Sequence, residues 1–289
     1  MNFNNLFEQY RCYIDSEIDC VLDKIEAHDE LKNAVAYSLK AGGKRIRPVL
    51  FIATLESLGV KYEKYAKLAV AIECIHTYSL IHDDLPALDN DDYRRGMPSN
   101  HKAFGEGIAI LAGDALLNLA IELALNSIDS KGALDAVKLL FDYSGVNGML
   151  NGQALDLHYE HSVIDEPECV LLKIDEFKTG KLLTAPMVMA SLIAGKKNIE
   201  EFKVLGQQTG RLFQFTDDLL DCVGTFENMG KTLGKDLTSG KLTAVSVYGV
   251  AKTQEIINET YMSIIKTLKN IDNNSFFIGF YDYIKNRKS

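Results

Sequence analysis

The sequence predicts an all-α protein built as one domain over residues 1–289. Apolar residues recur at spacings of three and four along most of the chain, which is the period of a helix face. Only five prolines interrupt the 289 residues, and almost no segment alternates apolar and polar residues as a half-buried strand does. No repeat, low-complexity segment or proline-rich linker divides the chain, so a single helical domain is the simplest interpretation.

The clearest helical patterns follow one another along the chain. A helix is expected to begin near Pro48, because proline is tolerated in the first turn of a helix. Further helices are predicted over residues 67–81, 108–127, 134–148, 204–223 and 243–268. The first two of these are apolar nearly all round, as expected of helices inside a large bundle. Breaks are expected at residues 41–43, 95–98, 130–132, 165–167, 195–197 and 228–240, which are rich in glycine, proline and polar residues.

Composition indicates an enzyme of the cytoplasm. The net charge of −9 and pI near 5.2 argue against a nucleic-acid partner. Five cysteines without CxxC spacing indicate reduced thiols, with Cys74 and Cys222 expected in the core of the protein. The N-terminal residues lack a basic start followed by an apolar block, so no signal peptide is expected. Residues 66–81 are too short and too polar to span a bilayer, so no stable membrane insertion is expected.

Two aspartate clusters are the most informative feature of the sequence. They cover residues 83–89 (DDLPALD) and 217–221 (DDLLD), and each ends a long apolar stretch, where unpaired carboxylates are costly. Divalent metal ions are the simplest useful counter-charge, and Mg²⁺ binds through one or two carboxylates together with water and phosphates. The sequence therefore predicts a magnesium–diphosphate site between the two aspartate clusters. A solvated acidic surface is the alternative, and the apolar flanks disfavour it.

The spacing within each cluster predicts how its carboxylates lie. Asp83 and Asp89 are six residues apart, so on a regular helix they would point about 120° away from each other. Pro86 kinks or ends the helix and would let Asp89 turn back toward Asp83. Asp217 and Asp221 are four residues apart, so both lie on one face of a helix without any such break.

Basic residues accompany the acidic clusters. The turn at Gly43 is followed by three cations, Lys44, Arg45 and Arg47. They precede an expected helix N-terminus, where free N–H groups favour anions. The further cations are Arg94, Arg95, Lys178, Lys181, Lys231, Lys235 and Lys241. Arginine matches phosphate oxygens with a forked geometry and lysine acts as a point charge, so this set suits a diphosphate.

Several motifs, in order, resemble those of the trans-isoprenyl diphosphate synthases. They are GGKRIRP, SLIHDDLPALDNDDYRRGMPSNHKAFGE, ILAGDALL, NGQALDL, FKTGKL, FQFTDDLLD and TLGKD. The chain is most similar to the bacterial farnesyl diphosphate synthase type, whose first aspartate motif carries two extra residues, here Pro86 and Ala87. The resemblance covers roughly residues 35–245, and the closing DYIKNRKS is similar to the basic C-terminus of the family. It implies about ten or more antiparallel helices around a central cavity, and a homodimer.

The resemblance also implies roles for individual residues. Three Mg²⁺ ions would be held by Asp83, Asp89 and Asp217, supported by Asp84 and Asp221. The allylic diphosphate would contact Arg94, Lys178 and Lys235, with Lys241 nearby, whereas isopentenyl diphosphate would contact Lys44, Arg47, His76 and Arg95 beside Gly43. Thr179 and Gln214 would place oxygens near the developing carbocation, Gln153 and Asp156 would face the cavity, and Asp114 would serve as a buried cap. A core histidine satisfied by its neighbours is the alternative for His76. After TLGKD the chain keeps Lys241 and Thr243 but lacks a further acid and a tyrosine found in the family pattern.

The implied activity is a magnesium-dependent head-to-tail condensation of isopentenyl diphosphate with dimethylallyl and geranyl diphosphate, giving farnesyl diphosphate. Ser79 lies four residues before Asp83, so it shares a helix face about 6 Å lower. Tyr78 is the adjacent bulky residue, and the resemblance implies that these two residues limit the product to C15. A synthase of C20 or other chain length is the main alternative. A terpene cyclase and a non-catalytic subunit of a heteromeric synthase are less favoured, because both aspartate clusters and GGKRIRP are intact.

Overall fold

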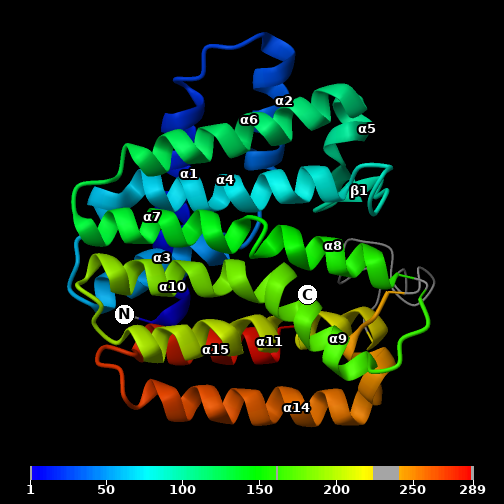
Figure 1. Ribbon diagram of the computed structural model, residues 1–289. Helices are drawn as coiled ribbons and strands as arrows, with labels where there is room; N and C mark the ends of the chain where they lie inside the picture. The colour runs from blue at the N-terminus through cyan, green and yellow to red at the C-terminus, as the bar shows by residue number, and fades with distance from the viewer. Residues whose placement is uncertain (1, 161, 224–240, 288–289) are drawn as a thin grey trace.

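A computed structural model describes residues 2–160, 162–223 and 241–287 of the chain. These residues are overwhelmingly helical, which confirms the all-α prediction (Figure 1). Within the described part, strands occur only as a two-residue antiparallel pair, β1 (Tyr93–Arg94) and β2 (Met97–Pro98), in the loop after the first aspartate cluster. Lys235 lies outside the described residues, as does the expected break at 228–240.

The helices follow one another with short connections. In chain order they are α1 (Phe3–Leu22), α2 (Asp29–Lys40), α3 (Ile46–Ser57), the 3₁₀ turn η1 (Tyr62–Tyr65), α4 (Ala66–Asp83), α5 (Asn100–Phe104), α6 (Glu106–Leu125), α7 (Lys131–Ser144), α8 (Met149–Tyr159), α9 (Pro167–Ile174), the π-helical turn η2 (Asp175–Gly180), α10 (Lys181–Ile193), α11 (Ile199–Val223), α14 (Ala244–Leu268) and α15 (Ser275–Asn286). Several of the long helices lie roughly parallel or antiparallel in stacked layers, from α6 through α4, α7 and α10 to α11 and α14 (Figure 1).

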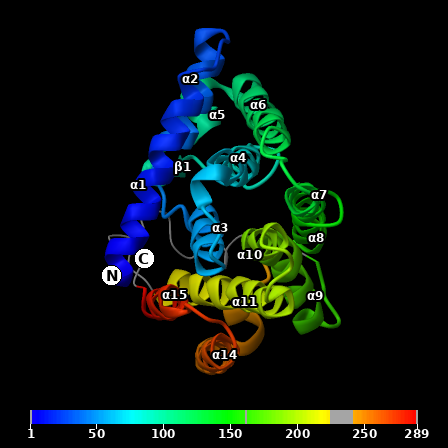
Figure 2. The same cartoon turned by 90° about the vertical axis from the view of Figure 1, so that its left-hand side faces the viewer.

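Three helices form the centre of the bundle. Viewed at 90° to the first picture, α3, α4 and α10 lie inside a ring that includes α1, α6, α7, α11 and α15 (Figure 2). Eight of the ten residues from Pro48 to Ser57 in α3 are buried, and the ten residues from Leu182 to Ser191 in α10 are all buried. One hydrophobic core runs through these helices and extends from Phe7 to Ile284. Of the two helices predicted to be apolar nearly all round, α4 is central as expected, whereas α6 lies in the ring and exposes Ile110 and Leu111.

Local capping shifts several predicted boundaries. The Ser130 side chain accepts a hydrogen bond from the main-chain N–H of Ala133, so α7 begins at Lys131 within the segment expected to break. This helix also ends at Ser144, so the predicted helix over 134–148 was too long at its C-terminal end. Thr243 forms a capping box with Ser246 and starts α14 where the pattern predicted, but Gly249 (φ 76°) kinks that helix.

The arginine in the middle of GGKRIRP belongs to the core and not to the anion-binding set. Arg45 is 4% exposed and pairs with Glu73 of α4 at 2.8 Å and with Asp15 of α1 at 2.9 Å. It also donates to the carbonyl of Leu39 at 2.6 Å, so its guanidinium joins three elements around the turn. A buried ion pair is stable only when such additional hydrogen bonds satisfy it. This anchor fixes the path of the turn that carries Lys44 and Arg47.

Two expectations about buried side chains were wrong. Cys74 is buried as expected, but Cys222 is exposed near the end of α11. Asp114 is exposed in the middle of α6, so it is neither buried nor at the end of a helix that it could cap. Ile110 and Leu111 near it also face outward, at 46% and 52% exposure. Among the described helices, α6 alone is long and apolar enough to cross a membrane, by length and composition.

Candidate active site

The first aspartate cluster lies where α4 ends. The helix stops at Asp83, three residues before Pro86, and the chain turns back on itself. The main-chain N–H of Asp89 donates to the carbonyl of Asp83 at 2.9 Å, which brings the two residues together as the proline predicted. Burial raises the pKa of Asp83, and the neighbouring carboxylate of Asp89 raises it further. The cluster is therefore a real concentration of negative charge, not a solvated acidic run.

Each carboxylate of this cluster has a polar partner from another part of the chain. Gln153 of α8 donates to Asp83 at 2.5 Å, and Arg94 of β1 pairs with Asp84, its Nε lying 3.0 Å from Oδ1. Lys241 pairs with Asp89 at 2.7 Å. Burial raises the pKa of Asp89, but Lys178 and Lys241 outweigh it and leave that pKa below its ordinary value. The cations predicted near a diphosphate thus contact the acidic cluster directly.

The second cluster lies on α11 and is held from the C-terminal end of the chain. Arg287 follows α15 and pairs with Asp217 at 2.5 Å, while its side chain is only 3% exposed. The same guanidinium donates to the carbonyl of Phe213 at 2.8 Å and lies over the Phe213 ring. Asp221 is buried on the same helix. Sequence reasoning noted the basic C-terminus but did not single out Arg287.

Oxygen donors of this kind fit Mg²⁺, which prefers carboxylates, water and phosphate. Within the described ranges, no three carboxylate, imidazole or thiol side chains converge as a ready-made metal cluster. Arg94, Lys241 and Arg287 already pair with Asp84, Asp89 and Asp217. The donor set therefore suits magnesium once these cations have an anion of their own to bind.

Lys178 enters the site from the π-helical turn η2. Its ammonium lies 2.6 Å from Asp156 of α8. Burial would lower the pKa of Lys178, but Asp83 and Asp156 more than offset this and raise it, so the side chain stays charged. The turn and α8 approach so closely that a Cβ on Gly152 would lie 2.1 Å from the main-chain N of Lys178. Glycine at that place in NGQALDL is thus required for the position of the lysine.

Thr179 and Gln214, which the resemblance places near the carbocation, contact each other. The Thr179 hydroxyl donates to Oε1 of Gln214 at 2.9 Å, and Nε2 of Gln214 donates to Asp218 at 2.8 Å. Asp218, the middle acid of DDLLD, is 6% exposed and was given no role from the sequence. Its burial beside a predicted catalytic pair is a feature that motif spacing alone does not reveal.

The expected isopentenyl diphosphate side is built on α3 and α4. Arg47 lies 3.2 Å from Nε2 of His76, and burial lowers the pKa of Arg47 to about 10. Nε of Arg47 is buried and meets no hydrogen-bond acceptor among the described residues, which leaves it available to an anion. Burial and the surrounding arginines lower the pKa of His76 well below its usual value, so its ring is neutral at pH 7. This histidine is not a plain core residue, because it lines a cavity.

Two further residues predicted to bind isopentenyl diphosphate, Lys44 and Arg95, lie at the turn before α3. Lys44 lies over the ring of Tyr283 at 5.8 Å, and burial lowers the pKa of Lys44. Arg95 donates to the carbonyl of Gly42 and packs on Gly43, where a Cβ would lie 2.7 Å from the Arg95 guanidinium carbon. Gly43 also has φ of 126°, so glycine is needed here twice over.

A cavity of about 280 Å³ is lined by part of this set, whereas Arg94 and Arg95 line a separate pocket beside Asp84. Its lining includes, among the predicted residues, Arg47, His76, Tyr78, Ser79, Asp83, Gln153, Lys178 and Thr179. Tyr78 is 4% exposed, and its ring lies 5.9 Å from that of His82 in an edge-on contact. His82 also lines the cavity and was not singled out from the sequence. The predicted chain-length residues therefore lie beside the predicted polar site, on one continuous wall.

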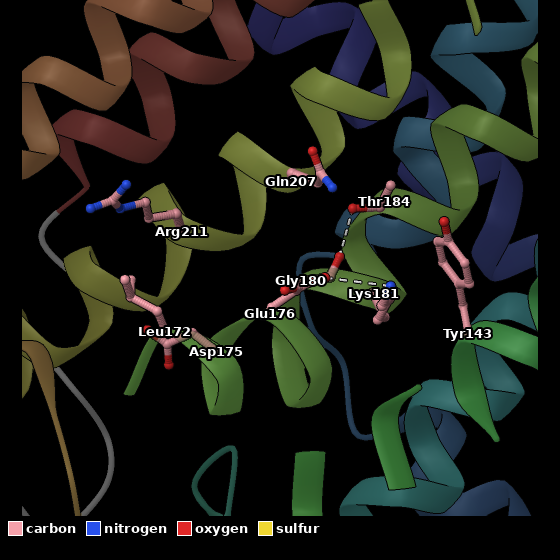
Figure 3. Close-up of a pocket in the computed structure, with 9 residues that line it drawn as sticks. All are labelled: Tyr143, Leu172, Asp175, Glu176, Gly180, Lys181, Thr184, Gln207 and Arg211. Atoms are coloured by element: carbon pink, nitrogen blue, oxygen red, sulfur yellow. Dashed lines mark hydrogen bonds and ion pairs between the residues drawn. The ribbon is translucent and has the colours of Figure 1, made fainter. Parts of the chain in front are cut away.

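A second cavity, of about 180 Å³, lies between η2 and the helices α7, α10 and α11 (Figure 3). Asp175, Glu176 and Lys181 line it, whereas Lys178 and Thr179 of the same turn line the first cavity. Lys181 lies 3.5 Å from Glu176 and 4.8 Å from the centre of the Tyr143 ring. Lys181 therefore belongs to this outer pocket and not to the predicted diphosphate site.

Comparison with known proteins decides the family. The family model described as Polyprenyl synthetase matches residues 28–274. The chain belongs to the polyprenyl synthetase family. As a polyprenyl synthetase it is an enzyme, a prenyltransferase that acts in isoprenoid biosynthesis.

Relatives of known name support this placement over nearly the whole chain. Farnesyl diphosphate synthase of Micrococcus luteus is 47% identical over 255 residues, which cover 86% of this chain and 87% of that protein. Geranylgeranyl pyrophosphate synthase 4 of Arabidopsis thaliana is 41% identical over 263 residues, 89% of this chain and 71% of that one. The Helicobacter pylori geranyltransferase, solved with magnesium and isoprenyl diphosphate, superimposes with a TM-score of 0.80 at 30% identity and covers 96% of each chain. These similarities confirm the isoprenyl synthase fold and leave the product length open.

Proposed function

We propose that this polyprenyl synthetase catalyses the magnesium-dependent, head-to-tail condensation of isopentenyl diphosphate with dimethylallyl and then geranyl diphosphate. The products are farnesyl diphosphate and pyrophosphate. The observation that carries the proposal is the single cavity on which acidic, basic and apolar groups converge. Asp83 and Lys178 lie at its polar part, Arg47 at its basic side and Tyr78 on its apolar wall. The farnesyl diphosphate synthase name of the 47% identical relative supports the C15 product.

Asp83, Asp89 and Asp217 would hold up to three Mg²⁺ ions, with Asp84 and Asp221 supporting them. When bound, the ions would neutralise charge on the diphosphate leaving group as it develops. Arg94 and Lys241 would turn to the allylic diphosphate, since each already pairs with a carboxylate of the first cluster. Lys178, which now pairs with Asp156, and Lys235 would join them. Arginine and lysine bound to phosphate oxygens stabilise the leaving group in the same way.

The second substrate, isopentenyl diphosphate, would bind to Lys44, Arg47, His76 and Arg95. A buried guanidinium with an unsatisfied Nε is a strong anion site, because a charge-assisted hydrogen bond is about twice as strong as a neutral one. His76 is neutral, so its ring would donate one N–H without adding charge. This arrangement would hold the double bond of isopentenyl diphosphate beside the allylic carbon.

The reaction itself needs no nucleophilic side chain. The allylic C–O bond breaks, pyrophosphate leaves with the bonding electrons, and C1 of the allylic group becomes a cation. The double bond of isopentenyl diphosphate attacks this carbon, and the new cation loses a proton to the departing pyrophosphate, which gives the lengthened allylic diphosphate. Thr179 and Gln214 would direct oxygen toward the first cation, and the apolar wall of the cavity would limit the access of water, which would otherwise quench it.

The remaining expectations concern the setting of the enzyme. A homodimer is proposed on the family resemblance, and the exposed apolar residues Ile110, Leu111, Ile121 and Leu125 of α6 offer a surface for it. Packing of α6 by this route would also account for its apolar composition without insertion into a membrane. A cytoplasmic location is proposed from the free cysteines and the acidic composition.

The proposed function is tested by product analysis. Purified protein is incubated with Mg²⁺, isopentenyl diphosphate and dimethylallyl diphosphate, and the products are sized after dephosphorylation. We expect C15 as the main product, and no product when EDTA exceeds Mg²⁺. A main product of C20 would favour the alternative function, that of a geranylgeranyl pyrophosphate synthase, which is the name of the Arabidopsis relative. The cavity would then have to be deeper than a C15 chain requires. Absence of any condensation under these conditions would contradict the proposal.

The two diphosphate sites should be separable by mutation. Arg47→Gln is expected to raise KM for isopentenyl diphosphate about ten- to hundredfold, the value of one charged hydrogen bond, and to leave KM for the allylic substrate unchanged. Arg94→Gln is expected to do the reverse. Lys252→Gln is the control, because Lys252 pairs with Glu255 on the exposed face of α14. Steady-state kinetics with each substrate varied in turn decide the assignment, and a rise in KM for only the allylic substrate in Arg47→Gln would reverse it.

A further inference from the structure

Asp218 links the start of α14 to the predicted catalytic pair through three hydrogen bonds. The main-chain N–H of Ala244 donates to Oδ2 of Asp218 at 2.6 Å. The side-chain amide of Gln214 donates to Oδ1 of Asp218 at 2.8 Å, and the Thr179 hydroxyl donates to Oε1 of Gln214 at 2.9 Å. Asp218 is 6% exposed and its hydrogen bond to Ala244 is buried, whereas the two hydrogen bonds of Gln214 are partly buried. The series runs from a helix N-terminus to the wall of the cavity.

The direction of every hydrogen bond in this series follows from its first member. A main-chain N–H can only donate, so the atom facing Ala244 must be an acceptor. A carboxylate accepts at both oxygens, which obliges Gln214 to present its NH₂ group to Asp218 and its carbonyl oxygen to Thr179. The Thr179 hydroxyl then uses its hydrogen on Gln214. Its oxygen lone pairs remain for whatever lies in the cavity, which Thr179 lines.

We propose that Asp218 is a positioning residue that fixes the amide orientation of Gln214 and thereby the polarity of Thr179. This inference rests on the proposed function, in which a carbocation forms beside Thr179. A hydroxyl oxygen turned toward that carbon stabilises positive charge, whereas a hydroxyl hydrogen turned toward it would oppose the charge. Asp218 does this without touching substrate, and its role differs from that of the metal-binding carboxylates proposed on either side of it. A cap for α14 is the simpler alternative, because a carboxylate at a helix N-terminus is stabilising in its own right.

Asp218→Asn separates the two roles. The Asn oxygen can still accept from Ala244, so the cap of α14 is kept. The Asn NH₂ group then faces Gln214, which must turn its carbonyl oxygen toward Asn and its NH₂ group toward Thr179. The Thr179 hydroxyl becomes the acceptor and directs its hydrogen into the cavity. We expect kcat to fall about ten- to hundredfold, the value of one charged hydrogen bond, with KM for both substrates unchanged.

Adding Gln214→Glu to Asp218→Asn should restore the rate. The Glu carboxylate accepts from the Asn amide and from the Thr179 hydroxyl, so the original polarity at Thr179 returns. The double variant has the net charge of the wild type. The wild type, the two single variants Asp218→Asn and Gln214→Glu, and the double variant form a double-mutant cycle. Thermal unfolding of each variant shows whether the α14 cap is intact. A loss of kcat with an unchanged melting temperature and rescue by Gln214→Glu is the expected result.

Three outcomes would overturn the inference. They are wild-type kcat in Asp218→Asn, a slow Asp218→Asn enzyme that Gln214→Glu does not restore, and a change confined to KM. Should Asp218→Asn fail to fold, Gln214→Met leaves the Asp218–Ala244 contact in place and should lower kcat without changing KM; an unchanged kcat would again contradict the inference. Failure of the wild type to condense the substrates at all would instead contradict the proposed function, so the two failures are distinguishable.

Discussion

Asp83→Ala and Asp217→Ala are each expected to lower kcat by several orders of magnitude. Both carboxylates lie at the predicted leaving-group site, where the charge of pyrophosphate must be neutralised as the C–O bond breaks. Burial raises the pKa of Asp83, which means that its ionised carboxylate is costly to hold in the folded protein. Loss of this carboxylate should therefore leave the free energy of unfolding unchanged or slightly higher, while activity is lost.

Turnover with saturating Mg²⁺ and substrates, together with urea unfolding, checks this result. Asp135→Ala is the matched control, since Asp135 forms an exposed ion pair with Lys131 on α7, away from the cavity. In Asp217→Ala the buried Arg287 loses its partner, so the stability of this variant should fall and its folded fraction must be measured. Rates close to wild type in either variant, or activity that survives excess EDTA, would contradict the metal assignment.

Tyr78→Ala is expected to shift the main product from C15 to C20 or longer. The Tyr78 ring lines the cavity and is 4% exposed, so its removal opens room on the apolar wall where the growing chain would lie. Ser79→Phe is expected to have the opposite effect and to favour C10. Ser79 lines the same cavity, and its hydroxyl donates only to the carbonyl of His76 in the preceding turn. A benzyl group there would fill space that the C15 product needs.

Chromatography of the dephosphorylated products checks both changes. Tyr13→Ala is the matched control, because Tyr13 packs edge-on against Tyr62 outside the cavity. This control should lose stability without any change in product length. Should Tyr78→Ala give the wild-type distribution, the wall that limits chain length would lie elsewhere, and His82, whose ring contacts Tyr78, would be the next residue to test.

The sequence predicted the helices well because their signal is local. Apolar periodicity within one segment is enough to identify α4 or α11 as helices, whereas a side-chain cap such as Ser130 decides where α7 begins. The wrong predictions for Asp114 and Cys222 have one cause. Both residues were judged buried from apolar neighbours, but α6 exposes Ile110 and Leu111 beside Asp114, and Cys222 lies on the outward side of α11.

The site residues divide into those that local spacing identifies and those that only the fold brings to the site. Spacing along the chain and motif resemblance identified Asp83, Asp217 and the basic groups, most of which the fold brings together. The partners of these residues could not be predicted, because they come from distant segments. Gln153 lies 70 residues from Asp83 and reaches it only through the packing of α8. The contact of Asp218 with Ala244 spans 26 residues and requires that α14 begins beside α11.

The ion pairs at the two acidic clusters have a consequence for ligand binding. Magnesium alone would have to displace Arg94, Lys241 and Arg287 from carboxylates that they already neutralise, and the displaced cations would be left without a counter-charge. A diphosphate that arrives together with the metal gives these cations new partners. By thermodynamic linkage, each ligand then strengthens the binding of the other. The enzyme should therefore have low affinity for either the free ion or the free diphosphate, and respond steeply to the concentration of their complex.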